Sequence, residues 1–520
     1  MKLIDRPRLL HLLAVISIAL FALTSLHADV RLPSFFTEHM VIQRDVSVPV
    51  WGWADPSEVV TVAFADQSKS ATADASGKWM LKLDPMPASA AGRDLIVQSS
   101  IENRQSKISD VLVGDVWLCS GQSNMHFRMK TVENADQEIA AAEHPHLRFF
   151  TVDHQFDQKA CANVAGAWMP ASPATVAECS AVAYYFGRDL VQKLGVPVGL
   201  IVSSVGGTRI ESWMRSETLA ATGESSALIE KWAKVSPDEF KNIATTYREF
   251  QRQRDEVHPQ AVKAAKASGS PVPPAPIMPK QRCHDCPSAL HNGMIAPLEP
   301  LALRGAIWYQ GESNSGQAAS YEKLLPAMIA DWRRVWGPEL PFLFVQLAPY
   351  RDTHPAFREA QHRIWQKTPH TAMVVTTDVD DAMNIHPTRK QPVGARLALA
   401  ARALSYGEKL EYSGPVFNSV KIDGGRAVIS FTHAGTGLKE TVGDLTGFTM
   451  AGANGKFLTA RAVIEGSTVV VTCDKIPQPV TVRYGWAMVP DVNLFNREGL
   501  PAVPFRTDQR LDPKGASESK

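Results

Sequence analysis

The ten residues Val116–Met125, VWLCSGQSNM, join a short apolar stretch to a polar turn. Val116–Cys119 predicts a strand, Ser120–Asn124 predicts the turn, and a helical pattern follows. A serine at a sharp strand-to-helix turn exposes its hydroxyl at the carboxyl end of a sheet, beside the free N–H groups of the helix start. Ser123 is therefore a candidate nucleophile, and the alternative is that it only caps a helix.

Around this stretch, residues 111–405 alternate between apolar strand patterns and amphipathic helix patterns. This alternation favours a parallel sheet covered on both faces, with sites in the loops after the carboxyl ends of its strands. The predicted strands are Val116–Cys119, Leu147–Val152, Val198–Ser204, Ala306–Tyr309, Phe342–Gln346 and Met373–Asp378. The predicted helices are Ala183–Leu194, Tyr321–Trp336, Ala356–Gln366 and Val393–Leu404.

Regions with β patterns lie on either side of this α/β domain. Residues 29–110 contain short alternating runs between Gly, Pro and Asp turns, which is typical of a small β-sandwich. Similar runs return over residues 406–510, and the polar residues 511–520 predict a disordered tail. A charged helical insertion, about 215–285, interrupts the α/β pattern. It is either a lid beside the site or a plain surface elaboration.

The first 28 residues have the features of a secretory signal. Three cations, Lys2, Arg6 and Arg8, precede an apolar run over Leu9–Leu26, and the small residue Ala28 follows it. An uncleaved anchor helix is the alternative, because the run is just long enough to span a bilayer. The segment Met1–Ala28 therefore predicts a secreted or periplasmic protein with no membrane contact after signal removal.

The charge balance of the 520 residues is almost neutral. Lys and Arg number 54 and Asp and Glu number 53, which gives a formal net charge of +1. Without a basic excess or an acidic tail, nothing in the composition suggests a nucleic-acid partner. The chain is too long for one ordinary core, so we expect more than one domain.

Other loops that follow predicted strands carry residues suited to ester cleavage. This reaction needs a nucleophile, a base, a group that orients the base, and donors for the oxyanion. His386 is the expected base for Ser123, because an imidazole takes and returns a proton near neutral pH. The expected oxyanion donors are the backbone of Ser123, Gly206 and Gly207 and the side chain of Gln310 or Asn314. The alternative is that each of these residues belongs to an ordinary polar turn with no catalytic role.

The same stretches resemble those of the sialate O-acetylesterase family, a branch of the SGNH hydrolases that is also related to some acetyl xylan esterases. The resemblance extends from the first β region almost to Arg506. The matching segments are Gly114–Met125 (GDVWLCSGQSNM), Ser203–Trp213 (SSVGGTRIESW), Pro287–Leu298 (PSALHNGMIAPL), Ala306–Asn314 (AIWYQGESN), Arg358–Gln361 (REAQ), Ile385–Pro387 with Val393–Ala398, Tyr412–Val416 (YSGPV) and Arg483–Trp486 (RYGW).

The resemblance implies a three-layer SGNH domain with a flavodoxin-like parallel sheet and accessory all-β regions at both ends. It also implies removal of acetyl groups from O-acetylated sugars without a metal ion or other cofactor. Ser123 matches the family's nucleophile and His386 its base, and Gly206, Gly207 and Gln310 match its oxyanion hole. The expected substrate contacts are Asn124, Arg209, Glu312 and Asn314.

The first expected substrate is O-acetylated sialic acid, and acetylated xylan or another polysaccharide is the alternative within the same chemistry. The alternative of another class is a carbohydrate-binding protein that has lost its activity. The intact residues Ser123, Gln310 and His386 favour the esterase. The oligomeric state stays open.

The chain departs from the SGNH pattern behind the histidine. Many SGNH hydrolases have the orienting aspartate three residues before the histidine, and here that position is Met383. The acidic residues nearby are Asp378, Asp380 and Asp381, of which Asp378, at the predicted strand end, is the first choice. The alternative is a Ser–His dyad with a backbone carbonyl holding the imidazole, in which the imidazolium gains less stabilisation.

Overall fold

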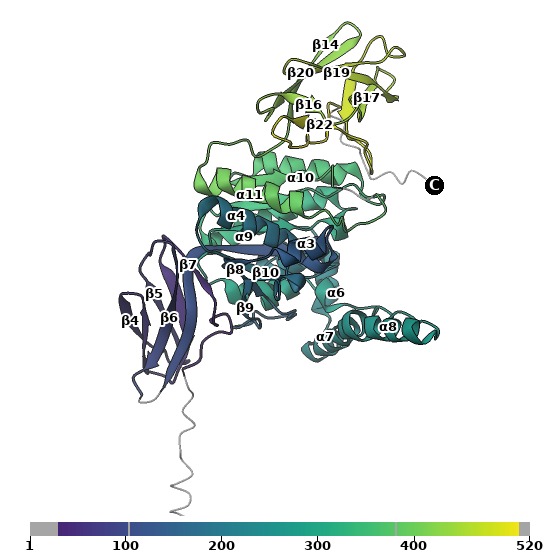
Figure 1. The fold of residues 1–520 in the computed structure, drawn as a ribbon. Coiled ribbons are helices and arrows are strands. Elements are labelled where there is room, and N and C mark those ends of the chain that lie inside the picture. The colour runs from purple at the N-terminus through teal and green to yellow at the C-terminus, as the bar shows by residue number, and fades with distance from the viewer. Residues whose placement is uncertain (1–29, 102–103, 380–381, 509–520) are drawn as a thin grey trace, which may run out of the picture. The chain divides into compact units, whose positions relative to one another are not determined.

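The computed structural model describes residues 30–101, 104–379 and 382–508, whose fold is shown in Figure 1. The predicted signal segment, the predicted tail 511–520 and the candidate acids Asp380 and Asp381 lie outside these ranges. The chain forms two compact units. Of the described residues, 30–33, 49–83 and 94–108 belong to the first unit, and 34–48, 84–93 and the chain from 109 onward belong to the second.

The first unit is built from antiparallel strands, as its alternating sequence pattern predicts. β3 (Val59–Phe64) pairs with β4 (Gln67–Thr72) and with β6 (Ser89–Ser99). β2 (Val48–Trp53) pairs with β5 (Lys78–Leu83), and every second residue of β5 is buried. Because side chains alternate between the faces of a strand, this pattern gives the unit one apolar face and one solvated face.

A central, mostly parallel sheet organises the second unit, in the order β13-β12-β11-β7-β10-β8-β9. Its strands run parallel except for β9, which pairs antiparallel with β8. All residues of β10, β11, β12 and β13 are buried, as expected for a covered parallel sheet. The bounds are β7 Gln105–Gly121, β8 His144–Thr151, β9 Trp168–Ala171, β10 Val198–Ser204, β11 Gly305–Tyr309, β12 Phe342–Val345 and β13 Thr371–Val374.

These strands confirm the predicted α/β pattern, with one correction at the last strand. β13 ends at Val374, so Asp378 lies in the loop beyond it and not at the strand end. Figure 1 shows the helices beside the sheet: α4 (Ala181–Leu194) packs against α11 (Gln391–Tyr406), and α9 (Ala318–Trp336) packs against α10 (Pro355–Lys367).

The predicted insertion is helical and lies between β10 and β11. Within it, Ser236 Oγ accepts the N–H of Glu239 at 3.2 Å and Pro237 occupies the first turn, which are strong helix-start signals. One π-helical turn, Gln253–Val257, joins the two longest helices, and such turns are frequent near functional sites. The helices are α5 Ser216–Ala221, α6 Ser226–Ala233, α7 Pro237–Arg252 and α8 His258–Ser268.

Beyond α11 the chain returns to antiparallel β structure around an aromatic core. The rings of Phe448 and Tyr484 lie 4.7 Å apart in this core. Arg506 pairs with Glu359 of α10 at 2.9 Å, which joins this β region to the helical layer. The strands are β14 Val416–Asp423, β15 Arg426–Thr432, β16 Leu438–Glu440, β17 Phe448–Ala451, β18 Leu458–Thr459, β19 Arg461–Glu465, β20 Thr468–Thr472, β21 Thr481–Tyr484, β22 Leu494–Asn496 and β23 Phe505–Arg506.

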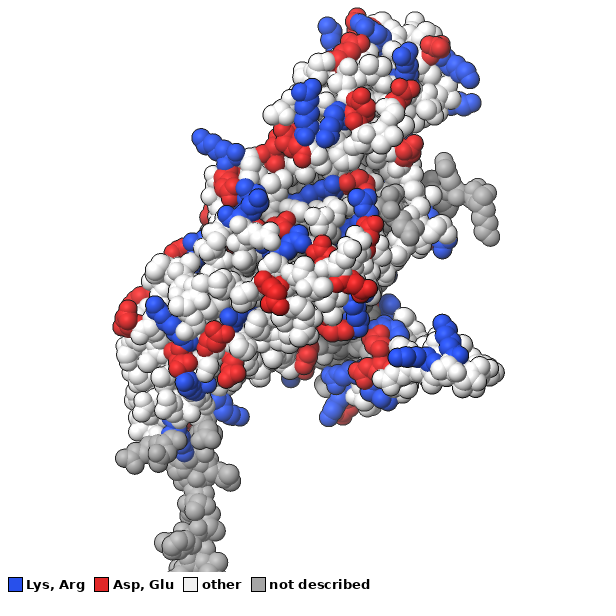
Figure 2. Space-filling view, viewed as in Figure 1, with Lys and Arg blue, Asp and Glu red and all other residues white. Residues whose placement is uncertain are grey.

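Two further features of the described residues are the charge on the surface and the composition of the helices. On the face seen in Figure 2, Lys and Arg side chains are interspersed with Asp and Glu, in keeping with the nearly neutral charge balance. Within the described ranges, no helix has both the length and the apolar character needed to cross a bilayer.

A buried carboxylate on β7 ties the centre of the sheet to its neighbours. Asp115 accepts hydrogen bonds from Arg44 Nε at 2.9 Å, from Arg304 Nε at 3.0 Å and from Tyr406 Oη at 2.9 Å. Burial raises the pKa of Asp115, but the Arg44 hydrogen bond and the charges of Arg304 and Arg44 hold it below its ordinary value. Arg44 follows β1 (Val41–Gln43), Arg304 precedes β11 and Tyr406 ends α11, so one charge fixes several elements.

We predict that Asp115→Ala lowers the free energy of unfolding by about 3–5 kcal/mol, because it leaves two partly buried arginines without the buried carboxylate that compensates them. Since the folded pKa is depressed, this contribution is present above the ordinary aspartate pKa and is lost as the pH falls. Urea unfolding at neutral pH measures the loss. The control is the exposed Asp45, which pairs with the same Arg44 at 3.2 Å and should cost less than about 1 kcal/mol when changed to Asn, a residue that tolerates the φ of +63° at this position. Equal losses would contradict this account.

Candidate active site

The candidate site begins where three neighbouring strands end at one level. Gly121 of β7 is aligned with Ser204 of β10 on one side and with Tyr309 of β11 on the other. Gly121 has a φ of +139°, and a Cβ there would lie 2.2 Å from the Tyr309 carbonyl oxygen, so only glycine fits. The next amide, Gln122 N–H, donates to that oxygen at 2.9 Å. The chain therefore turns sharply out of the sheet into α2 (Ser123–His126).

Ser123 and His386, which are far apart in the sequence, meet at this edge. Ser123 Oγ lies 2.7 Å from His386 Nε2, within hydrogen-bond distance. With a neutral imidazole, the hydroxyl donates to the ring nitrogen, which is the arrangement of a nucleophile and its base. Burial and the charge of Lys390 lower the pKa of His386, so this ring stays neutral to lower pH than an exposed histidine.

The loop that carries His386 is held by amide side chains. Asn384 Oδ1 accepts the backbone N–H of His386 at 2.9 Å. Asn124, the residue after the candidate nucleophile, donates from Nδ2 to the carbonyl of Ile385 at 3.0 Å. The ring of Phe127 lies 6.3 Å from the imidazole, centroid to centroid. These contacts orient the histidine loop through its backbone.

Asp378, the acid that the sequence favours as the partner of His386, binds an arginine instead. Both carboxylate oxygens of Asp378 accept from Arg396, at 2.7 and 2.6 Å, and the Asp378 carbonyl accepts from Arg389 Nη1 at 2.8 Å. None of the described carboxylates hydrogen-bonds to His386. The structure therefore brings together Ser123 and His386 but does not bring Asp378 to them, because the arginine on α11 binds both of its oxygens.

The glycine pair after β10 lies beside the candidate nucleophile. A Cβ on Gly206 would lie 3.4 Å from Ser123 Cβ, so the backbone of the two residues is in close proximity. Gly207 has a φ of +73°, a conformation that favours glycine. Within the described part of the chain, no acceptor binds the backbone N–H groups of Ser123, Gly206 and Gly207. These amides are available to a developing oxyanion.

Gln310, in contrast, is fully engaged within the protein. Its Nε2 donates to the Thr208 carbonyl at 3.1 Å and to Asn314 Oδ1 at 2.8 Å, and its Oε1 accepts from Tyr321 Oη at 3.0 Å. Asn314 is buried as well and donates to Glu211 Oε2 at 2.9 Å. Both amides therefore join the loop after β11 to the loop after β10, with no donor left for an oxyanion.

The side chain of Asn124 lies between two buried charged groups. Its Oδ1 accepts from Lys390 Nζ at 2.5 Å, and its Nδ2 donates to Glu312 Oε1 at 2.5 Å. The Lys390 ammonium also lies 4.8 Å from the ring of Phe127 and 5.2 Å from that of Tyr309. Burial lowers the pKa of Lys390 to about 7 and raises that of Glu312. No motif in the sequence singles out Lys390; the one signal is that it follows His386 by four residues.

Two histidines extend the site toward the helical insertion. The ring of His126, at the end of α2, lies 5.4 Å from that of His154, which follows β8. Burial and the neighbouring His154 lower the pKa of His126 to about 4, so the ring is neutral at physiological pH. Gln251 of α7 lies within hydrogen-bond distance of His154, with 3.1 Å between Nε2 and Nδ1. The insertion therefore contacts a loop at the same edge of the sheet.

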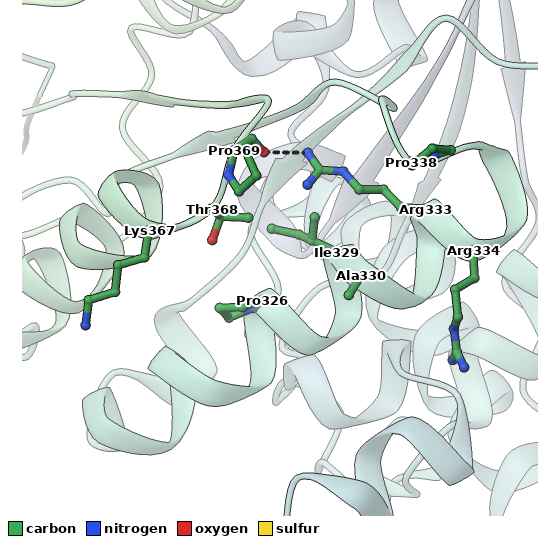
Figure 3. Close-up of a pocket in the computed structure, with 9 residues that line it drawn as sticks. All are labelled: Pro326, Ile329, Ala330, Arg333, Arg334, Pro338, Lys367, Thr368 and Pro369. Atoms are coloured by element: carbon green, nitrogen blue, oxygen red, sulfur yellow. Dashed lines mark hydrogen bonds between the residues drawn. The ribbon is translucent and has the colours of Figure 1, made fainter.

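A separate cavity of about 600 Å³ lies near the amino ends of β12 and β13, and Figure 3 shows the residues that line it. It is lined by the C-terminal half of α9, by the last residue of α10 and by the loops that lead into β12 and β13. Arg333 donates to the Pro369 carbonyl at 2.9 Å there, as the dashed line in Figure 3 shows. The cavity is thus remote from the carboxyl ends where Ser123 lies.

Comparison with known proteins identifies the family. A family model described as carbohydrate esterase, sialic acid-specific acetylesterase, matches residues 113–255 and 288–403, ranges that include Ser123 and His386. The sialate O-acetylesterase of Mus musculus is 30% identical over 447 residues, which cover 78% of this chain and 79% of the mouse protein. The chain belongs to the sialate O-acetylesterase family. It is therefore a carboxylic-ester hydrolase, as the sequence motifs predicted.

Two further relatives support membership of the sialate O-acetylesterase family. The sialate O-acetylesterase of Homo sapiens is 30% identical over 462 residues, covering 81% of this chain and 79% of the human protein. A carbohydrate acetylesterase from Xanthomonas citri has a solved structure that matches with a TM-score of 0.78 at 35% identity, over 92% of this chain and 100% of that one. The mixed α/β architecture with further β-sheets is thus that of a carbohydrate esterase.

For this member of the sialate O-acetylesterase family, we predict that Asp378→Asn lowers the stability of the fold and keeps kcat within about tenfold of wild type. The expectation follows from its partner Arg396, since a triad aspartate changed to asparagine loses about 10⁴-fold in kcat. Steady-state hydrolysis of p-nitrophenyl acetate and thermal unfolding measure the two effects. Arg396→Met is the matched variant and should lose comparable stability. A loss of kcat near 10⁴-fold on Asp378→Asn would instead assign Asp378 to His386.

Proposed function

We propose that the chain removes O-acetyl groups from sugars by serine acyl-enzyme chemistry, with Ser123 as nucleophile and His386 as base. The observation that carries this proposal is the 2.7 Å distance between Ser123 Oγ and His386 Nε2. Ser123 Oγ attacks the acetyl carbonyl carbon while His386 takes its proton, and the histidine then returns that proton to the departing sugar oxygen. Water attacks the acetyl-serine by the same route and releases acetate.

The oxyanion in this mechanism is bound by the backbone N–H groups of Ser123, Gly206 and Gly207. Their amides have no acceptor in the described structure, and Gly206 adjoins the nucleophile. Gln310 acts indirectly, since its bonds to Thr208 and Asn314 hold the loops together. Donors held rigidly at the oxyanion stabilise the transition state more than the ground state.

A Ser–His dyad is the version of the mechanism that the described residues favour. Backbone contacts through Asn384 and Ile385 hold the imidazole loop, while Arg396 binds both carboxylate oxygens of Asp378. Asp380 and Asp381 lie outside the described residues and remain candidates for a third member.

We favour O-acetylated sialic acid as the substrate, and acetylated xylan or another polysaccharide is the second candidate. The named activity of the mammalian relatives supports the first. So does Arg209, which follows the glycine pair, is half-buried and forms no ion pair within the described ranges. A free guanidinium suits the carboxylate of an acidic sugar. Of the other expected contacts, Asn124 donates to Glu312 and Asn314 donates to Glu211, so these side chains join neighbouring loops of the site.

The remaining parts of the proposal concern architecture and location. We propose that the α/β part, residues 111–405, is a three-layer SGNH domain, flanked by β regions at 29–110 and 406–510. The motif resemblance supports this assignment, as does the parallel sheet with its helices. We further propose that residues 1–28 are a signal for secretion or export to the periplasm, on the composition of that segment alone.

Ser123→Ala is expected to abolish hydrolysis of p-nitrophenyl acetate, because removal of the nucleophile of a Ser–His pair lowers kcat by about 10⁶-fold in a comparable hydrolase. The matched control is Ser120→Ala, three residues earlier on β7, where a buried hydroxyl has no hydrogen-bond partner in the described structure. That variant should keep wild-type activity. Equal, negligible hydrolysis by wild type and Ser123→Ala would favour the carbohydrate-binding alternative.

Arg209→Met is expected to raise KM for O-acetylated sialic acid by about ten- to hundredfold, because one charge-assisted hydrogen bond is worth about 1.5–3 kcal/mol. Its kinetics on p-nitrophenyl acetate, which has no carboxylate, should be unchanged. Acetate release from O-acetylated sialic acid and from acetylated xylo-oligomers measures the difference. A wild-type preference for the neutral oligomers would assign the enzyme to polysaccharides instead.

A further inference from the structure

The cluster of Lys390, Asn124 and Glu312 has no part in the steps proposed above, yet it adjoins Ser123 along the chain and binds the peptide before His386. Asn124 directly follows Ser123 on α2, and Lys390 lies in the same loop as His386, just before α11. Both residues are almost completely buried. A buried lysine is costly, so its presence beside the Ser–His pair calls for a physical role.

The two charges determine the orientation of the Asn124 amide. Its oxygen faces the Lys390 ammonium, and its NH₂ group faces the Glu312 carboxylate. If the amide were rotated by half a turn, its NH₂ would meet a donor and its oxygen would meet two acceptors. Only one orientation satisfies all partners, and in it Nδ2 also donates to the Ile385 carbonyl at 3.0 Å.

We propose that Lys390 is a positioning residue, which acts through Asn124 to hold the Ile385–His386 peptide and so keeps the imidazole within reach of Ser123. The inference rests on the proposed Ser–His function and adds a residue to it. An aspartate in a Ser-His-Asp triad orients the ring through Nδ1. Here the buried cation orients the loop through its backbone, and the Phe127 and Tyr309 rings enclose the ammonium.

Lys390 also has an electrostatic effect that a purely structural residue would lack. The ionisable groups around it are Glu312, His386 and the phenol of Tyr309, whose pKa burial raises so that it stays neutral. Together with burial, the Lys390 charge lowers the pKa of His386. Removal of the ammonium therefore raises the pKa of His386 and moves the acid limb of the pH–rate profile to higher pH.

The test is Lys390→Met, assayed with p-nitrophenyl acetate across the pH range in the full-length protein. We expect kcat to fall on the order of a hundredfold with little change in KM, since misplacement of a base by about 1 Å has such an effect. We also expect the acid limb to move to higher pH. Lys367→Met is the matched control, because it removes an exposed lysine at the end of α10 and should leave both quantities unchanged.

A second variant, Lys390→Met with Glu312→Gln, covers the case in which the single variant unfolds because Glu312 is left unpaired. It removes both buried charges, and the same loss of kcat and the same shift are expected. Wild-type kcat in either folded variant would overturn the inference, as would a lower kcat with an unmoved acid limb. If wild type is active, Ser123→Ala is inactive and Lys390→Met is normal, only this inference fails. An inactive wild type would overturn the proposed function and this inference together.

Discussion

The register of three parallel strands is the constraint on which the candidate site depends. β7 lies between β10 and β11, and Gly121, Ser204 and Tyr309 stand at one level where these strands end. The loops that follow therefore start within a few ångströms of one another, since neighbouring strands are about 4.8 Å apart. A shift of one residue in this register would turn the side chains of β7 to the opposite face and separate the loops. Asp115, with its arginine and tyrosine partners, stabilises this arrangement from within β7.

At the carboxyl ends of β7, β10 and β11, some hydrogen-bond donors have no acceptor and others are fully paired. The backbone amides beside Ser123 have no acceptor in the described structure, whereas the side chains of Gln310 and Asn314 are saturated with partners. This division has a physical logic, because a preorganised oxyanion site needs unpaired donors on a rigid support. The buried Lys390–Asn124–Glu312 cluster extends the same support to the histidine loop.

Local pattern indicates which loops carry most of the candidate site residues, and the contacts that it does not indicate have a common cause. Ser123 and Gly206 follow apolar runs that are recognisable as strands, and the family motifs include His386. Asp378 was a reasonable choice by its distance from His386 in the sequence, but Arg396, one turn into α11, binds both of its oxygens. Gln310 likewise has the right chemistry and position, yet Thr208 and Asn314 take up its two N–H groups. Sequence spacing indicates which loop a side chain belongs to and does not indicate which partner is nearest.

The sequence by itself determined the alternation of strands and helices, the β character of both flanking regions, the helical insertion and the family. These features follow from periodicity, caps and motifs, which are local properties of the chain. Only the tertiary structure decided which donors are free, where the Asp378 carboxylate points, and that Lys390 lies against Asn124 beside the candidate pair of Ser123 and His386. The physical reason is that burial and hydrogen bonding depend on partners outside the local pattern, from the 18 positions that separate Asp378 from Arg396 to the 266 that separate Asn124 from Lys390.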